Sequence, residues 1–186
     1  MKRKLSIGLG ILALAAAVPF ATSTPVLANL AQAGETLVQN ILQPKVKLVL
    51  GAQKQVVSTD AEGQEVTTWA ALEGQAEVQP GDVLRYTLSS ENAGDKPAEK
   101  LVLTQPVPSK TAYVADSAKA NGAELTYSID GGKTFSAQPM VEVTLPDGKV
   151  EMQPAPAATY THVRWDYGTS LKPMASVRAV YEVAVK

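Results

Sequence analysis

The only histidine of the chain, His162, lies in a segment whose residues alternate like a β-strand. Alternation places His162, Arg164 and Asp166 on one face of this strand and Val163 and Trp165 on the other. Such a polar row has the groups of a proton relay, but it is also typical of a hydrated strand surface with one cross-strand ion pair. We favour the second interpretation, because no Gly-x-Ser-x-Gly turn accompanies the histidine. We therefore expect no catalytic residues and a protein that is not an enzyme.

A second group of chemically capable residues runs from Ser128 to Phe135. It fits the pattern Ser-x-Asp-x-Gly-x-Thr-aromatic and resembles the Asp-box hairpin of sialidases. We expect Asp130 to accept backbone N–H groups across the turn and Gly131 or Gly132 to take a positive φ. Phe135 is then expected to anchor the hairpin to the core. In sialidases the box lies apart from the catalytic residues, so one copy predicts a structural turn rather than a glycosidase.

The composition excludes several other kinds of site. No cysteine is present, which rules out disulfides, zinc–thiolate sites and a lipid-modified cysteine. Aspartates occur singly at the expected turns, whereas calcium requires six to eight oxygen ligands, so we expect no metal site and no cofactor. Seventeen basic residues against 18 acidic ones give no basic surface for phosphates, so no nucleic-acid partner is expected.

The first 28 residues have the order of a secretory signal peptide. Basic residues 2–4 precede an uncharged run at 5–18, and small residues at 26–28 fit a cleavage site after Ala28. The alternative is an uncleaved anchor, but a membrane span takes about 20 apolar residues and this run is shorter. No later stretch is as apolar, so we expect no membrane span after cleavage. The predicted location is the periplasm, the cell surface or the extracellular space.

The remaining elements indicate an all-β fold. Residues 29–44 are expected to form a leader or linker, and from Lys45 onward apolar residues recur with a period of two. Turn signals such as Pro80-Gly81-Asp82 separate eight to ten short strands, and no long amphipathic helix is present. We therefore predict an antiparallel β-sandwich over residues 45–186, following a cleaved N-terminal signal helix over residues 1–28.

Several motifs together resemble a bacterial surface-repeat family, the domain of unknown function eleven. They are 78–88 (Val-Gln-Pro-Gly-Asp-Val-Leu-Arg-Tyr-Thr-Leu), 91–95 (Glu-Asn-Ala-Gly-Asp), 97–98 (Pro-Ala), 101–108, 111–117, 163–165 (Val-Arg-Trp) and 171–173 (Leu-Lys-Pro). The resemblance covers residues 45–186, although Gln105 stands where the family usually has Asp. It implies an immunoglobulin-like sandwich in an exported or cell-surface bacterial protein, and it brings no catalytic residues.

These observations favour an exported, non-catalytic structural or interaction module of the bacterial cell envelope, with an unknown envelope protein or a glycan as its partner. The alternative is a carbohydrate-binding module, for which Trp69 in a polar stretch is the candidate stacking residue, together with the Asp-box-like hairpin. A secreted hydrolase is a third and weaker interpretation. Exposure of Trp69 decides between the first two.

Overall fold

The computed structural model describes residues 5–6, 15–16, 44–73, 77–119 and 122–186. The predicted signal helix is therefore described only at Leu5–Ser6 (β1) and Ala15–Ala16 (β2), and both fragments are extended because they pair with later strands. The rest of the predicted signal peptide, the cleavage residue Ala28 and residues 29–43 of the predicted leader lie outside the described residues.

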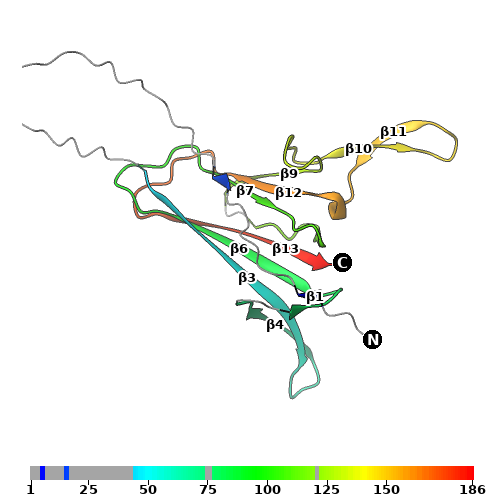
Figure 1. The fold of residues 1–186 in the computed structure, drawn as a ribbon, viewed down its shortest axis with the longest axis horizontal. Coiled ribbons are helices and arrows are strands. Elements are labelled where there is room, and N and C mark those ends of the chain that lie inside the picture. The colour runs from blue at the N-terminus through cyan, green and yellow to red at the C-terminus, as the bar shows by residue number, and fades with distance from the viewer. Residues whose placement is uncertain (1–4, 7–14, 17–43, 74–76, 120–121) are drawn as a thin grey trace, which may run out of the picture.

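The larger sheet has five antiparallel strands in the order β4-β3-β6-β13-β8. Their bounds are Glu65–Ala71 (β4), Val46–Thr59 (β3), Val83–Asn92 (β6), Ser176–Val185 (β13) and Thr111–Tyr113 (β8). The long strands β3, β6 and β13 run side by side and form most of one layer (Figure 1).

The second sheet has the order β2-β7-β12-β9, with Val102–Pro106 (β7), His162–Asp166 (β12) and Glu124–Ser128 (β9). Met140–Thr144 (β10) and Val150–Pro154 (β11) pair only with each other and extend away from the two layers as a ribbon (Figure 1). Glu77–Val78 (β5) pairs with β1, and Ala157–Thr159 (η1) forms one turn of 3₁₀ helix before β12.

The core lies between these two sheets. Trp165 of β12 and Tyr181 of β13 are 0% and 1% exposed, and their ring centroids are 5.9 Å apart. The Tyr181 hydroxyl donates to the Pro106 carbonyl of β7 at 3.0 Å, so an aromatic side chain of one layer also hydrogen-bonds the other. Burial of large apolar side chains from both layers supplies the main stabilisation, since disulfides are absent.

Strict alternation explains how the same strands build a core and a polar surface. In β6 the even-numbered residues Leu84, Tyr86 and Leu88 are buried, and the odd-numbered residues between them face outward. The final strand behaves in the same way, with Ala179, Tyr181, Val183 and Val185 buried as the sequence predicts. The predicted all-β sandwich is confirmed, and none of the described helices is long and apolar enough to span a membrane.

Candidate functional site

The predicted polar row of β12 is present, but it does not form a relay. Val163 and Trp165 are fully buried, and His162, Arg164 and Asp166 are half-buried on the opposite face. The Arg164 guanidinium lies 3.5 Å from the centroid of the Phe135 ring, and Asp166 accepts the Gly168 N–H at 2.9 Å. The three polar side chains therefore interact with neighbouring groups and not with one another through hydrogen bonds.

His162 sits against the turn of the predicted Asp-box-like hairpin. Its Nδ1 is 3.2 Å from the Thr161 hydroxyl, and a Cβ placed on Gly132 would lie 3.2 Å from the imidazole. Burial holds the pKa of His162 below its ordinary value of 6.5; the Asp130 charge raises it, and the Arg164 charge lowers it further. The imidazole therefore packs against the turn at Gly132, and its neighbour Thr161 accepts the Gly131 N–H at 3.1 Å and donates to the Ser128 carbonyl at 3.0 Å.

Asp130 organises this turn as the sequence predicts. Its carboxylate accepts the Lys133 N–H at 3.0 Å, the Thr134 N–H at 3.0 Å and the Thr134 hydroxyl at 2.6 Å, and the Ser128 hydroxyl donates to it at 2.7 Å. These hydrogen bonds, those from Thr134 above all, hold the pKa of Asp130 well below its ordinary value. Since both carboxylate oxygens are engaged by the turn, Asp130 has a structural role in this arrangement.

Both turn glycines adopt a backbone conformation that favours glycine, whereas the expectation that Phe135 anchors the hairpin to the core is wrong. Gly131 and Gly132 have φ values of +78° and +85°. Phe135 does not anchor the hairpin to the core. The returning chain bridges β9 only at Tyr127–Ser136, which leaves Phe135 on the outer side of β12 between Arg164 and the edge of His162.

Trp69 lies in edge strand β4 and is half-buried. The Arg85 guanidinium lies 3.6 Å from its ring centroid and is itself held by Glu182, whose Oε1 accepts from Arg85 Nε at 3.0 Å and Nη2 at 2.8 Å. The ring face that Arg85 covers is not open to a sugar. This cation–π contact accounts for an aromatic residue in a polar stretch and occupies one of the two ring faces.

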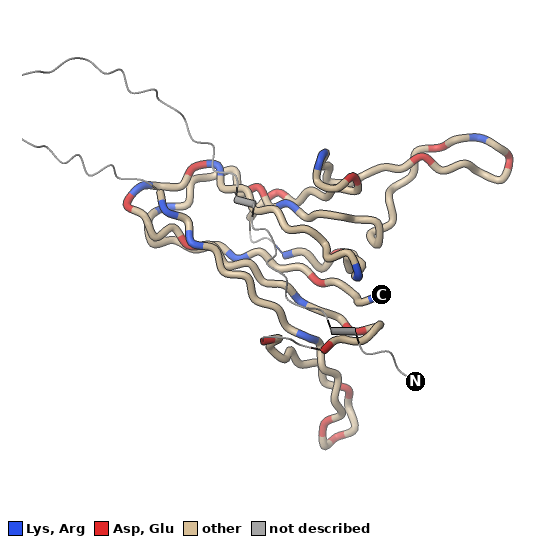
Figure 2. The backbone as a smooth tube through the Cα atoms, in the orientation of Figure 1, with Lys and Arg blue, Asp and Glu red and all other residues tan. Residues whose placement is uncertain are grey.

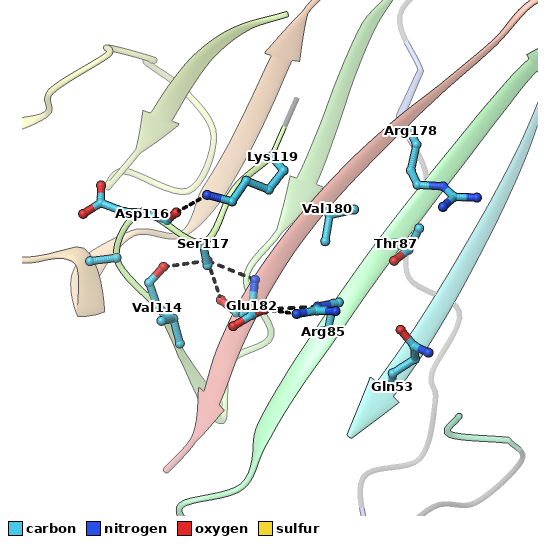
Figure 3. A pocket seen from close by; sticks show the side chains of 11 residues that line it. Gln53, Arg85, Thr87, Val114, Asp116, Ser117, Lys119, Arg178, Val180 and Glu182 are labelled. Carbon is cyan, nitrogen blue, oxygen red and sulfur yellow. Dashed lines mark hydrogen bonds and ion pairs between the residues drawn. The ribbon is translucent and has the colours of Figure 1, made fainter. Parts of the chain in front are cut away.

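The Arg85–Glu182 pair lies at the floor of a hollow on the outside of the five-stranded sheet (Figure 3). The hollow has a volume of about 560 Å³ and is bordered on one side by the turn over residues 114–119. Ser117 fastens this turn to β13, because its Oγ accepts the Glu182 N–H at 3.0 Å and donates to the Val114 carbonyl at 2.6 Å. The wall of the hollow is therefore tied to the sheet.

The same polar surface continues along the strands. We call it the outer sheet face, and it comprises Lys47, Val49 and Gln53 of β3, Arg85, Thr87, Ser89 and Glu91 of β6, and Ser176, Arg178, Val180 and Glu182 of β13. A second hollow of about 450 Å³ lies beside Ser89, Ser176 and Arg178. Arg178 is exposed, points away from Glu182 in Figure 3, and has no hydrogen-bond or ion-pair partner among the described residues.

The remaining candidate groups, namely the acidic side chains and the other aromatic residues, do not form a further site among the described residues. In the described ranges, no three His, Asp or Glu side chains lie together as metal ligands. Asp60 and Asp147 accept N–H groups of their own turns, which is the role that isolated turn aspartates are expected to have. Tyr113 and Tyr167 are buried, so they do not form an exposed aromatic patch with Trp69.

Sequence reasoning missed the outer sheet face as a unit. The alternation in β6 and β13 predicts which residues point outward, but only the strand order reveals that Arg85 meets Glu182, 97 residues away, and Trp69. No family model, curated protein or solved structure matches this chain. The likeness to the surface-repeat family therefore stays a prediction.

Proposed function

We propose that this chain is an exported, non-catalytic structural or interaction module of the bacterial cell envelope, and that the outer sheet face is its contact surface. The side chains that had the chemistry for catalysis are engaged elsewhere: Asp130 holds a turn, His162 packs against Gly132, and Arg164 lies on Phe135. This leaves recognition as the function that the described residues support best.

The observation that carries the proposal is the shape and chemistry of the outer sheet face. Its two larger hollows, of about 560 and 450 Å³, are open to solvent and are lined by charged and polar side chains interspersed with valines such as Val177 and Val180. Small-molecule sites are mostly concave and apolar, whereas protein interfaces are broad and carry polar groups around a few anchors. A wide polar surface on paired strands therefore suits a macromolecular partner, either an envelope protein or a glycan.

Arg178 is the residue of this surface best placed to act as an anchor. It is exposed and unpaired among the described residues, and arginine is enriched among the residues that dominate binding energies. Around it, Lys and Arg are interspersed with Asp and Glu over both sheets (Figure 2). Such a mixed distribution favours specific pairing over general attraction to a polyanion.

The export part of the proposal rests on the signal-peptide pattern and the likeness to surface repeats. A basic start, an apolar run and the small residues before Asn29 are read by the export machinery irrespective of the fold that follows. The number of acidic residues, 18 against 17 basic ones, is compatible with an exposed module that does not adhere to nucleic acid.

Binding of the purified chain to isolated envelopes of the source bacterium tests the proposal. We expect saturable binding that Arg178→Glu weakens at least fivefold, because it reverses the charge of an exposed anchor. Lys133→Glu is the matched control, since Lys133 is also an exposed cation and lies on the hairpin turn of the other sheet. Equal binding by both variants and the parent would contradict the assignment of this surface.

A further inference from the structure

Three tyrosines from different elements meet where the two sheets approach each other at one edge. Tyr113 ends β8, Tyr127 lies in β9, and Tyr160 follows η1. The ring centroids of Tyr127 and Tyr160 are 4.7 Å apart. The ring centroid of Tyr113 lies 5.4 Å from that of Tyr127 and 5.5 Å from that of Tyr160. We call these three residues the tyrosine cluster.

A hollow of about 230 Å³ opens beside the tyrosine cluster. The remaining lining residues are Ala115, Asp116, Ala137, Gln138 and Ala157. Sites for larger organic ligands occupy about 300–1,000 Å³, so this hollow suits one small chemical group rather than an extended ligand. Four of its lining residues are aromatic or acidic, and none of them is basic.

Hydrogen bonds to the tyrosine hydroxyls hold the cluster in place. The hydroxyl oxygens of Tyr113 and Tyr127 are 3.3 Å apart and hydrogen-bonded, and the Ala118 N–H donates to the Tyr113 hydroxyl at 3.2 Å. Tyr113 is buried, whereas Tyr127 and Tyr160 are half-buried and reach the hollow.

Asp116 adds a negative charge that is not neutralised at this place. Its carboxylate has no hydrogen-bond or ion-pair partner among the described residues. Lys119 donates to the Asp116 backbone carbonyl at 3.4 Å, and Figure 3 shows the carboxylate pointing away from that lysine. Asp116 lines the same hollow as Tyr127 and Tyr160. Burial raises the pKa values of both tyrosines, and the Asp116 charge raises them further.

The backbone at Asp116 also holds an uncommon conformation. Its φ is +59°, a left-handed value that Asp and Asn tolerate better than most residues. The turn that carries it is fixed on its other side by the bonds of Ser117 to β13. The carboxylate is therefore presented beside the tyrosines by a constrained turn.

We propose that the hollow beside the tyrosine cluster binds an organic ammonium group. A cation in this position is attracted by the quadrupoles of the tyrosine rings and by the carboxylate of Asp116. The group can be supplied by a free quaternary amine or by the end of a lysine side chain, because both present the same charge on an alkyl stem. This site goes beyond the proposed function and does not depend on a partner at the outer sheet face.

The test is an NMR titration of the purified chain with choline, with N-acetyl-lysine methylamide and with 3,3-dimethylbutan-1-ol. The last compound has the shape of choline without its charge. We expect saturable shifts of Tyr127, Tyr160 and Gln138 with at least one cation and binding of the neutral compound at least tenfold weaker. The relative affinities of choline and the lysine derivative distinguish the two sources of the group.

Three variants test the two attractions separately. Asp116→Asn retains the size and the tolerance of positive φ but removes the charge, and it should weaken cation binding at least fivefold. Tyr160→Phe retains the ring and should bind within threefold of the parent, whereas Tyr160→Ala should bind at least tenfold more weakly. Unchanged amide shifts elsewhere in each variant establish that it is folded.

Three outcomes would overturn the proposal. They are the absence of saturable shifts with either cation, equal affinity for the cation and its neutral isostere, and unchanged affinity in folded Asp116→Asn. A neutral sugar that binds at these residues while both cations do not would assign the hollow to saccharides instead. None of these results bears on Arg178, so failure here and failure of the proposed function are distinguishable.

Discussion

At the residue scale, the side chains with the chemistry for catalysis, Asp130 and His162, contact the turn at residues 130–134 and stabilise the fold. The sequence predicts that Asp130 binds backbone N–H groups of its turn, and it accepts those of Lys133 and Thr134, because the two glycines reverse the chain back toward its carboxylate. The contact of Gly132 with His162 was not predictable, because the two residues are brought together only when β9 pairs with β12. Pattern reasoning thus identifies the turn but not what packs against it.

The two turn glycines should respond differently to substitution. Alanine at either position places a Cβ in the left-handed region, which costs on the order of 1–3 kcal/mol. At Gly131 nothing lies within 4 Å of that Cβ, whereas at Gly132 the Cβ would lie 3.2 Å from the His162 ring. We therefore expect Gly132→Ala to reduce the free energy of unfolding in urea more than Gly131→Ala.

Asparagine supplies the control for this prediction, because it tolerates positive φ. Gly131→Asn should lose much less free energy of unfolding than Gly131→Ala. Gly132→Asn should lose about as much as Gly132→Ala, since its Cβ still meets the His162 ring. Equal losses at both positions would mean that His162 does not restrict this turn.

His162 should make stability depend on pH in the mildly acidic range. Burial lowers its pKa in the folded state, so below about pH 6.5 the unfolded chain binds a proton that the folded chain does not. The free energy of unfolding should therefore fall as pH is lowered through this range. Urea titrations at pH 7.5 and 5.5 should show a smaller difference in His162→Gln than in the parent. The same difference in both would assign this pH dependence to other groups.

At the element scale, alternation predicts the long strands well and the short connections poorly. The buried faces of β6 and β13 follow directly from the sequence. The polar stretch before Trp69 did not indicate that β3 continues to Thr59 and pairs with β4, because neither strand has a fully buried side there. Likewise, the separation of β10 and β11 from both sheets depends on the path of the whole chain.

Asn92, at the end of β6, joins elements that the sequence keeps far apart. Its Nδ2 donates to the carbonyls of Lys96 and Leu171 at 2.7 and 2.9 Å, and its Oδ1 accepts the N–H groups of Lys45 and Gly94. The side chain is fully buried. Asn92, which the sequence analysis gives only as part of the 91–95 motif, thus connects the start of β3, the turn after β6 and the segment before β13.

Replacing Asn92 should therefore be strongly destabilising. Asn92→Asp conserves the shape but turns a buried donor into a carboxylate that faces two carbonyl oxygens, and we expect a loss of about 2 kcal/mol or more in the free energy of unfolding. Asp95→Asn in the same turn is exposed and should change it by less than about 0.5 kcal/mol. Denaturant titrations of both variants should show this contrast, and similar losses would contradict it.

At the scale of the whole molecule, the all-β class and the sandwich could be predicted because burial on alternating faces requires two layers. The outer sheet face and the tyrosine cluster could not, because their members come together only through the order of strands in each sheet. Arg85 and Glu182 are adjacent through the pairing of β6 with β13, and Tyr113 meets Tyr127 where the edge strands of the two layers approach. Neither composition nor the alternation within one strand predicts which residues of different strands become neighbours.

The predicted signal peptide makes a prediction for a chain expressed from Met1. Expression in a bacterium should release a form beginning at Asn29, because small residues at 26–28 precede the predicted cleavage site. Ala28→Leu should leave a longer, membrane-associated form, which intact-mass measurement would detect. A cytoplasmic, full-length product in both cases would remove the export part of the proposal.

The central claim is that the exported chain contacts an envelope component through its outer sheet face. Its most direct test is photo-crosslinking in living cells, with a photoreactive residue placed at Ser176 on that face or at Lys133 on the opposite sheet. We predict a discrete adduct with one envelope component from Ser176, lost when Arg178→Glu is combined with it, and none from Lys133. An adduct from Lys133 alone, or none from either position, would contradict the account.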